Sequence, residues 1–540
     1  MTTLPNHSMQ HGTLSLGPGD LTPRAVWTAA RKLSEAVPNL RVSIDGGTRE
    51  RIARAANAVV SRAAGTSPVY GLNTGVGALR HVVIERDHLA QLQVNLLRSH
   101  ACGVGEALPR ATVAAMWIHW MNSAAQGHRG VRLETVDACI DLLNRGVLAT
   151  VPSRGSVGAS GDLAPAAHAA LLLIGEGVCS MPDSGEIRTM PAAEALRRTG
   201  RAPLTLGAKE ALSLINGTHL TTALACQVWT EAETLWRVAT FAAALSTYGF
   251  RANPQVTRAE VLDMHHPATL YAGLRKQEWF SGATNPPVFR NYQQDPYCFR
   301  CTPQVHGAVW KEIEQSEEWI VEELGATTDN PVVLETGEFA HGGNFHAIFP
   351  ARVLDRLASA LTQLASISER RTNLGMDSRK TGLPDFLTPE GGLNSGLMMT
   401  QTTAAALVSE CKTLSFPASV DSIPTNCDQE DHVSMGPIAG LKAVRICGNA
   451  RDVLAIEILA ACQAVHLRGA EVLPPRLRRV YEAIRQTVPP IECDRTFAED
   501  IRAIAGMIEA SIEDDALFGH FANLDDEREA HATSDSQHRA

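Results

Sequence analysis

Three consecutive residues, Ala159, Ser160 and Gly161, are the most suggestive of chemistry in this chain, and they lie in a stretch of small residues at 155–165. Three glycines recur in that stretch at a spacing of three and free the backbone from most steric limits. Because no bulky side chain intervenes, the Gly161 nitrogen could attack the Ala159 carbonyl carbon. Loss of water, including the Ser160 hydroxyl, would then leave a five-membered ring with an exocyclic methylene. Such a ring is an electrophile that no ordinary side chain supplies.

Two commoner uses of a glycine-rich turn fit this stretch less well. A phosphate-binding loop would end in Gly-Lys-Ser/Thr, which is missing here. A nucleophile elbow would read Gly-x-Ser-x-Gly, and Gly158-Ala159-Ser160-Gly161 is one residue short of that pattern. From the spacing alone, an ordinary structural turn also remains open.

Five further motifs share the chain with this stretch. They are Tyr70-Gly71-Leu72-Asn73-Thr74-Gly75-Val76-Gly77, Asn216-Gly217-Thr218, Gln294-Asp295-Pro296-Tyr297, Gly342-Gly343-Asn344-Phe345-His346 and Gln429-Glu430-Asp431-His432-Val433-Ser434-Met435. In type and in order, the six motifs resemble those of the histidine and aromatic amino acid ammonia-lyases. The resemblance runs from residue 70 to residue 435, which is most of the chain.

The resemblance implies a carbon–nitrogen lyase that removes ammonia from an α-amino acid and leaves a conjugated acrylate. It also implies 4-methylidene-imidazol-5-one, formed autocatalytically from Ala159, Ser160 and Gly161, with no external cofactor. That group could bind the substrate amine and make it a better leaving group, while a base removes the β-proton. Tyr70 is the expected base; because a phenol ionises weakly, it would need hydrogen bonds or positive charge nearby. Taken alone, Tyr70 would be interpreted as a half-buried tyrosine.

The other motif residues carry expected roles in binding. Arg300 is expected to clamp the substrate carboxylate, since a guanidinium can hold two oxygens at once. Asn216 is expected to hydrogen-bond either that carboxylate or the ring carbonyl of the prosthetic group. The resemblance adds Gln294 and Phe345 as pocket residues and Tyr297 as a catalytic residue beside the electrophile.

Substrate choice is expected to depend on His100 and Glu430, which match the pattern of the histidine lyases. A carboxylate and a histidine can bind an imidazole at its two nitrogens. Phenylalanine would leave both groups unsatisfied, at about 1–3 kcal/mol each. Glu430 also counts among the expected catalytic residues, and Met398 matches a substrate-binding position of the histidine lyases.

The resulting prediction is conversion of L-histidine to trans-urocanate. Cys298-Phe299 departs from the Ser-Leu that is usual there, and several alternatives stay open. They are a tyrosine or phenylalanine ammonia-lyase, a lyase for a histidine derivative, a 2,3-aminomutase, and a helical binding or scaffold protein without catalysis.

The elements that must position these residues are predicted to be mostly helices. Apolar residues recur every three or four positions at 309–324, at 354–367 and, on a broader face, at 441–467. Strand signals are few, with candidates at Ser67–Tyr70 and Val332–Leu334. Asp162 is expected to cap a helix start.

The predicted fold is therefore mainly α, and the resemblance implies an ammonia-lyase/aspartase-like fold. Residues 21–220 are expected to form a mixed N-terminal head that carries the prosthetic group. Residues 221–510 are expected to form a long central helical bundle and C-terminal helices. The polar segments 1–20 and 524–540 are expected to be disordered.

Composition limits the partners. Lys and Arg total 48 and Asp and Glu total 58, and the net charge of −10 argues against a nucleic-acid binder. No apolar run reaches the length of a membrane span, and no secretory signal is visible. The 11 cysteines form no disulfide or metal framework, so we expect a cytoplasmic protein without a metal. The resemblance implies a homotetramer whose active sites are shared between subunits.

Overall fold

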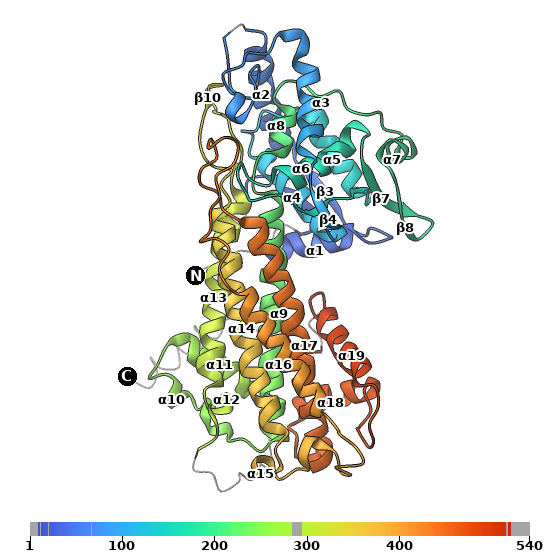
Figure 1. The fold of residues 1–540 in the computed structure, drawn as a ribbon, viewed down its shortest axis with the longest axis vertical. Helices are drawn as coiled ribbons and strands as arrows, with labels where there is room; N and C mark the ends of the chain where they lie inside the picture. Colours follow the sequence, from blue (N-terminus) through green and yellow to red (C-terminus); the bar gives the residue numbers. More distant parts are fainter. Residues whose placement is uncertain are drawn as a thin grey trace.

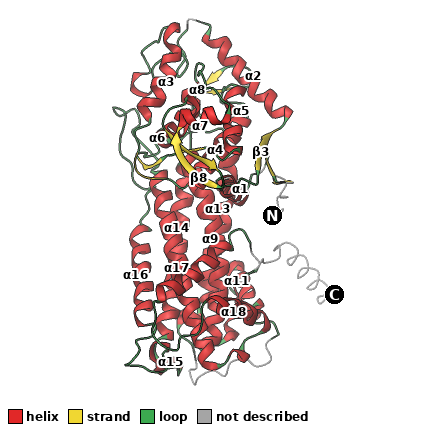
Figure 2. Cartoon of the chain, turned by 90° about the vertical axis from the view of Figure 1, so that its right-hand side faces the viewer, coloured by secondary structure: helices red, strands yellow, loops and turns green. Residues whose placement is uncertain are grey.

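The computed structural model describes residues 9–10, 12–19, 21–65, 67–282, 294–514 and 517–519. The polar tail expected at 524–540 lies outside the described residues, as does much of the extension expected at 1–20. Long helices run side by side along the long axis of the molecule, and a head of shorter helices and small sheets covers one end of them (Figures 1 and 2).

The central bundle consists of five long helices. They are α9 (His219–Gly249), α13 (Thr302–Gly325), α14 (Ile348–Gly375), α16 (Met398–Leu414) and α17 (Gly436–Arg468). Shorter helices flank the bundle: α10 (Ala259–Leu262), α11 (Pro267–Glu278), α12 (Tyr297–Arg300), α15 (Ser378–Thr381), α18 (Pro475–Thr487) and α19 (Phe497–Ala510).

The apolar stripes predicted from the sequence are confirmed as the packing faces of these helices. In α13, Val309, Ile313, Ile320 and Leu324 are all buried. The broader face of α17 is buried on more than one side, because α17 packs against α9, α14, α16 and α19. Between α14 and α17, the fully buried Arg371 and Glu457 form an ion pair at 2.5 Å.

The head contains eight helices and the described strands. The helices are α1 (Pro23–Leu33), α2 (Gly46–Ala63), α3 (Leu89–His100), α4 (Arg110–Ala125), α5 (Leu133–Asn144), α6 (Leu163–Leu171), α7 (Ala192–Thr199) and α8 (Glu210–Ile215). Helix α9 starts at His219, close to the expected boundary between head and bundle, and packs against α4 and α1.

Four small sheets accompany these helices. In the first, β1 (Met9–Gln10) pairs antiparallel with β2 (Thr13–Leu16), and β2 pairs parallel with β3 (Arg41–Ile44) in the register Leu14 to Val42. The other sheets are antiparallel: β4 (Val104–Ala107) with β6 (Pro152–Arg154), β5 (Leu148–Ala149) with β7 (Val178–Asp183) and then β8 (Glu186–Pro191), and β9 (Val332–Val333) with β10 (Phe339–Ala340).

Three local expectations need correction. Order begins before residue 21, because β2 buries Leu14 and Leu16 against the head. The segment Ser67–Tyr70 is not a strand but enters a turn, in which Asn73 Oδ1 accepts the Val69 N–H. Asp162 precedes α6 without capping it by its side chain, because its carboxylate instead accepts the Thr221 N–H at 2.8 Å.

The strand expected at Val332–Leu334 is confirmed over Val332–Val333. Within the described ranges, every helix is too short or too polar to cross a membrane.

Candidate active site

A cavity of about 670 Å³ lies in the head, near the end of the bundle. Its wall combines loop and helix-end residues that are far apart in the sequence. Seven residues predicted for the site line it: Tyr70, His100, Ala159, Ser160, Asn216, Phe345 and Glu430.

The turn that contains Ala159, Ser160 and Gly161 is held tightly against the segment after α8. The Gly217 N–H donates to Ser160 O at 3.4 Å, and the Asp162 N–H donates to Gly217 O at 2.8 Å. Gly161 has a φ of +80°, and a Cβ there would lie only 2.1 Å from Gly217 O. Only glycine therefore fits at Gly161, and this close, side-chain-free turn suits the cyclised group that the motif implies.

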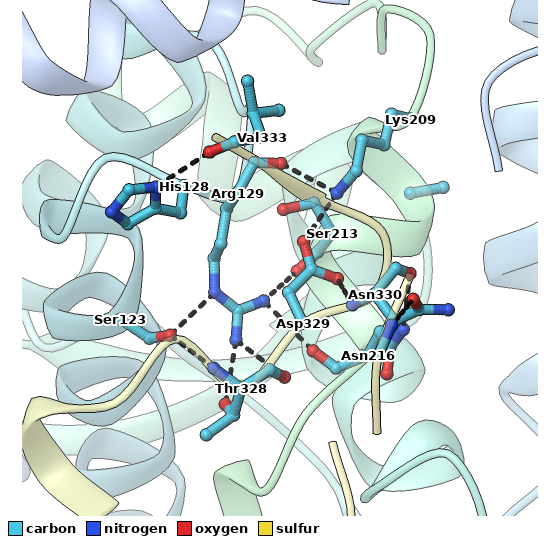
Figure 3. A network of polar contacts seen from close by, with 12 residues as sticks. Ser123, His128, Arg129, Lys209, Ser213, Asn216, Thr328, Asp329, Asn330 and Val333 are labelled. Carbon is cyan, nitrogen blue, oxygen red and sulfur yellow. Dashed lines mark hydrogen bonds and ion pairs between the residues drawn. The ribbon is translucent and has the colours of Figure 1, made fainter. Parts of the chain in front are cut away.

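Asn216 presents an unused acceptor to the same cavity. Its Nδ2 donates to Asn330 O at 2.9 Å, whereas its Oδ1 is buried without a hydrogen-bond partner among the described residues (Figure 3). An orphaned buried acceptor is costly unless a ligand supplies a donor. The role expected for Asn216, a hydrogen bond to the substrate carboxylate or to the ring carbonyl of the prosthetic group, stays a prediction. The free carbonyl oxygen can in addition accept an N–H, which is a second feature that fits an amine-binding group at Ser160.

Glu430 lies beside the turn and is held from several sides. The Ser160 hydroxyl donates to Glu430 Oε1 at 3.0 Å, and the Thr425 hydroxyl donates to Oε2 at 2.8 Å. Asn426 Nδ2 donates to Oε1 at 3.3 Å. The carboxylate is thus fixed in orientation and faces the position of the predicted electrophile.

Tyr70 is half-buried on the opposite loop. Its hydroxyl oxygen accepts the Gly77 N–H at 3.3 Å, and its ring meets His341 edge-on with centroids 5.9 Å apart. Asn426 Oδ1 accepts the Ala78 N–H at 3.2 Å and so joins this loop to the Glu430 loop. Sequence reasoning missed His341 and Asn426; for Asn426 no motif gave a signal.

His100 ends α3 and has a defined tautomer. Its Nδ1 lies 2.9 Å from Leu96 O, which can only accept, so Nδ1 carries the hydrogen. Burial lowers the pKa of His100 below its ordinary value, although the Leu96 carbonyl and the Glu430 carboxylate oppose the shift. In the neutral ring, Nε2 is therefore an acceptor.

A stacked histidine pair completes the cavity wall. The rings of His346 and His432 have centroids 5.6 Å apart, and His432 Nδ1 lies 3.5 Å from His346 Nε2. Burial lowers the pKa of His346, and His432 adds to the shift as a like charge while its backbone opposes it. Both residues belong to motifs of the chain, His346 to Gly342–His346 and His432 to Gln429–Met435, but neither motif indicates that the two rings stack.

Three predicted site residues lie elsewhere. Gln294, Tyr297 and Arg300 share a separate cavity of about 350 Å³ at α12, toward the end of the bundle remote from the head (Figure 1). There Arg300 hydrogen-bonds Gln294 Oε1 and lies over the Tyr297 ring, 4.7 Å from its centroid. Within one chain, Arg300, the expected carboxylate clamp, therefore lies in a different cavity from Ser160, the centre of the expected electrophile.

Met398 also lies outside the head cavity. It is the first residue of α16 and lines neither of the two cavities. One turn later, Gln401 donates to Glu369 in the last turns of α14 at 2.8 Å. In that same stretch of α14, Arg371 donates to the Cys298 carbonyl of α12 at 3.4 Å, so Met398 lies near the α12 end of the bundle.

Across the described residues, no group of three His, Cys, Asp or Glu side chains is arranged to hold a metal ion. All 11 cysteines are unpaired thiols.

Comparison with known proteins gives consistent matches. A family model described as aromatic amino acid lyase matches residues 21–486. A histidine ammonia-lyase from Symbiobacterium thermophilum is 45% identical over 473 residues, which are 87% of this chain and 92% of that protein. The crystal structure of histidine ammonia-lyase from Trypanosoma cruzi matches with a TM-score of 0.85 and 33% identity, covering 95% of this chain and 99% of that one. A tyrosine aminomutase from Streptomyces globisporus has the same TM-score at 32% identity, covering 92% and 96%.

Proposed function

The chain belongs to the aromatic amino acid lyase family, and we propose from this premise that it eliminates ammonia from L-histidine to give trans-urocanate. It is a carbon–nitrogen lyase, and its relatives include proteins named histidine ammonia-lyase. The fold is also compatible with an aminomutase, so the choice of substrate and outcome rests on the site itself.

The observation that carries the proposal is a pair of acceptors in the cavity beside Ser160. Glu430 offers carboxylate oxygens, and neutral His100 offers Nε2 because its Nδ1–H is committed to Leu96 O. A neutral imidazole ring supplies one N–H to one of these acceptors and an imidazolium supplies one to each, whereas a phenyl ring supplies none. A site built to hydrogen-bond its substrate rejects an analogue that lacks the polar group by about 10⁴–10⁵. Phe345 adds an apolar wall for the ring.

The remaining roles follow from the contacts. 4-Methylidene-imidazol-5-one, formed from Ala159, Ser160 and Gly161 without an external cofactor, supplies an electrophile for the substrate amine. Asn216 Oδ1 accepts an N–H of that amine, since no described residue donates to it. Tyr70 takes the β-proton, and the Gly77 N–H steadies negative charge on its oxygen.

We infer that the working enzyme is a homotetramer with shared sites. Arg300, Tyr297 and Gln294 face a cavity at the far end of the bundle, and Tyr297 is 68% exposed in the single chain. Large apolar side chains such as Met399 and Phe416 are also exposed along the bundle. Packing of bundles from several subunits would cover these residues and bring the clamp of one chain to the electrophile of another. The free thiols support a reducing, cytoplasmic location.

A substrate panel tests the proposal. Purified protein is incubated with histidine, tyrosine, phenylalanine and methylated or thiolated histidines, and acrylate formation is followed by ultraviolet absorbance and mass spectrometry. We expect urocanate and free ammonia from histidine, no β-amino acid, and no turnover by Ser160→Ala. Turnover of tyrosine or phenylalanine with histidine untouched would contradict the proposal, and β-amino acid would indicate an aminomutase.

A further inference from the structure

Arg129 is a fully buried arginine in the loop between α4 and α5, and its guanidinium is surrounded by polar groups that include the backbone of Asn216, a residue of the candidate site (Figure 3). Its Nη1 donates to Ser213 O at 2.6 Å and to Asn216 O at 3.0 Å. Its Nη2 donates to Thr328 Oγ1 at 3.1 Å and to Thr328 O at 3.4 Å. Its Nε donates to Ser123 Oγ at 3.0 Å. Among the described residues it forms no ion pair, so backbone carbonyls and hydroxyls hold the cation.

The backbone of Arg129 is fixed as well. Lys209 Nζ donates to Arg129 O at 2.8 Å and forms an ion pair with Asp329 at 2.5 Å, with both side chains fully buried. Asp329 Oδ1 in turn accepts the Asn330 N–H at 2.8 Å. The guanidinium is therefore held at a defined position. Its five N–H donors lie in one plane and reach several separate oxygens, which the single ammonium group of a lysine could not do.

The segment that Arg129 holds is the one pressed against the Ala159–Gly161 turn. Gly217 lies between that turn and Thr328: a Cβ on Gly217 would lie 2.4 Å from Thr328 O, and a Cβ on Gly161 would lie 2.1 Å from Gly217 O. Arg129 binds the carbonyls on both sides of this contact, at Asn216 and at Thr328. It thus holds the Asn216–Gly217 peptide, whose Gly217 N–H donates to Ser160 O.

The hydrogen bonds across this contact leave the reacting nitrogen free. The Gly217 N–H donates to Ser160 O, and the Gly217 carbonyl accepts the Asp162 N–H, so the bonded groups lie on either side of Gly161. The Gly161 N–H donates to no group of the described chain. The turn is therefore fixed on both sides of a nitrogen that is itself unengaged.

We propose that Arg129 is a positioning residue for formation of the prosthetic group, an inference that rests on the proposed function. By holding Asn216-Gly217 against the turn, it sets the Gly161 nitrogen on the Ala159 carbonyl carbon. The new N–C bond forms as the Ala159 oxygen leaves as water with hydrogens from the Gly161 and Ser160 nitrogens. The Ser160 hydroxyl leaves as a second water with the Ser160 α-hydrogen, and the step needs no oxidant or reductant. A displacement of about 1 Å can slow such an intramolecular step by about 10²-fold.

The test compares Arg129→Lys and Arg129→Met with a matched control in the same head. Arg110 also binds backbone carbonyls, donating to Gly146 O at 2.7 Å and to Ser34 O and Ser180 O at 3.0 Å. Arg110→Lys and Arg110→Met therefore remove a comparable guanidinium that does not touch the turn. The full-length proteins are purified as folded species, and intact mass with peptide mapping of 155–165 measures the fraction that has lost two waters.

We expect wild type and both Arg110 variants to have lost two waters, while cyclisation in the Arg129 variants is slowed by about 10–100-fold. Cyclisation of folded Arg129→Met and Arg129→Lys at the wild-type rate, followed by the same mass measurement at intervals after synthesis, would overturn the inference. A wild-type protein at its full sequence mass would instead overturn the proposed function, so the two failures are distinguishable.

A milder variant covers the case in which the Arg129 variants do not fold. Thr328→Val keeps the shape of the side chain and removes the Oγ1 acceptor of the Arg129 guanidinium. We expect folded Thr328→Val to lose its two waters about two- to tenfold more slowly after synthesis, as loss of one hydrogen bond implies. Cyclisation at the wild-type rate in this variant would overturn the inference.

Discussion

Ser160 and Glu430 lie 270 residues apart in the chain, yet the Ser160 hydroxyl donates to Glu430 Oε1 at 3.0 Å. The other donors to this carboxylate, Thr425 and Asn426, come from its own loop. Formation of the proposed prosthetic group would remove the Ser160 hydroxyl and leave Glu430 Oε1 one donor short. A half-buried acceptor that loses its donor gains by binding another, and the N–H of a substrate imidazole at the same place would supply it.

Replacement of Glu430 by glutamine tests this role. The Glu430→Gln variant keeps the size of the side chain but loses the charge and one acceptor, and hydrogen bonds to charged groups contribute about 1.5–3 kcal/mol. We expect kcat/KM for histidine to fall by about 10–100-fold, with the two-water loss intact by mass spectrometry. Glu338→Gln, at an exposed glutamate of the β9–β10 turn, serves as the control and should match wild type. Unchanged kinetics in Glu430→Gln would remove Glu430 from substrate binding.

Replacement of His100 tests the choice of ring. His100→Phe removes the Nε2 acceptor and adds an apolar edge to the cavity, so the ratio of kcat/KM for histidine over phenylalanine should fall by about 10–100-fold. His88→Phe, at an exposed histidine just before α3, should leave that ratio unchanged. The ratio is measured by steady-state kinetics with both substrates, and an unaltered ratio in His100→Phe would show that another group selects the imidazole.

Much of the helical bundle, and several residues of the head cavity, could be predicted from the sequence. The periodicity of the apolar residues predicted α13, α14 and α17, because a helix that packs on one face has an apolar residue at every third or fourth position. The motifs predicted that Tyr70, Ser160 and Glu430 belong to one site, and all three line the head cavity. Strand β2 was missed because a four-residue strand is stable only when β3 lies beside it, and the pattern of the chain does not show that partner.

Some features of the site have no sequence pattern at all. Arg129 acts through backbone carbonyls, which every residue type possesses, so no motif marks its partners. Asp162 was expected to cap α6, but its carboxylate instead accepts the N–H of Thr221, which is distant in the sequence. The separation of Arg300 from Ser160 reflects the length of the bundle, which the spacing of the motifs in the sequence does not report.

A methyl group at Gly77 tests the link between the Tyr70 and Glu430 loops. Gly77 has a φ of +58°, and a Cβ there would lie 2.0 Å from Asn426 Nδ2. Gly77→Ala should therefore displace Asn426 and lower kcat/KM at least about tenfold, as misplacement of catalytic groups does. Gly185→Ala introduces the same backbone strain at a φ of +86° with no atom within 4 Å. Each variant should lose about 1–2 kcal/mol of stability, because alanine is strained in the left-handed backbone conformation. Only Gly185→Ala should keep full activity. Equal kcat/KM in the two variants would contradict the link between the loops.

Lys276 predicts a pH dependence of stability. It is buried without a hydrogen-bond partner among the described residues, and burial lowers its pKa to about 7, helped by Arg371 and opposed by Glu457. Between pH 7 and 10 the unfolded lysine holds a proton that the folded one lacks, so this group makes stability rise with pH. Lys276→Met removes the penalty, and we expect it to be more stable than wild type at pH 7 by up to about 4 kcal/mol.

The advantage of Lys276→Met should shrink steadily as the pH rises and vanish only above the ordinary lysine pKa of 10.5, where the folded and unfolded lysine are both deprotonated. Melting temperatures measured from pH 6 to 10 would record this, with the exposed Lys412→Met as a control that shows no such trend. A destabilised Lys276→Met at pH 7 would mean that the lysine has a partner in the assembled protein.

Complementation tests whether active sites are shared between subunits. Tyr70 and Arg300 face different cavities of one chain, so Tyr70→Phe and Arg300→Gln should each be nearly inactive for different reasons. In co-expressed mixed tetramers, about a quarter of the sites should combine an intact Tyr70 from one chain with an intact Arg300 from another. Activity should therefore return when differently tagged subunits are purified together. A mixture of Tyr70→Phe with Ser160→Ala should stay inactive, because those two residues share one cavity. Mixed tetramers of Tyr70→Phe and Arg300→Gln without activity would mean that each chain builds its site alone.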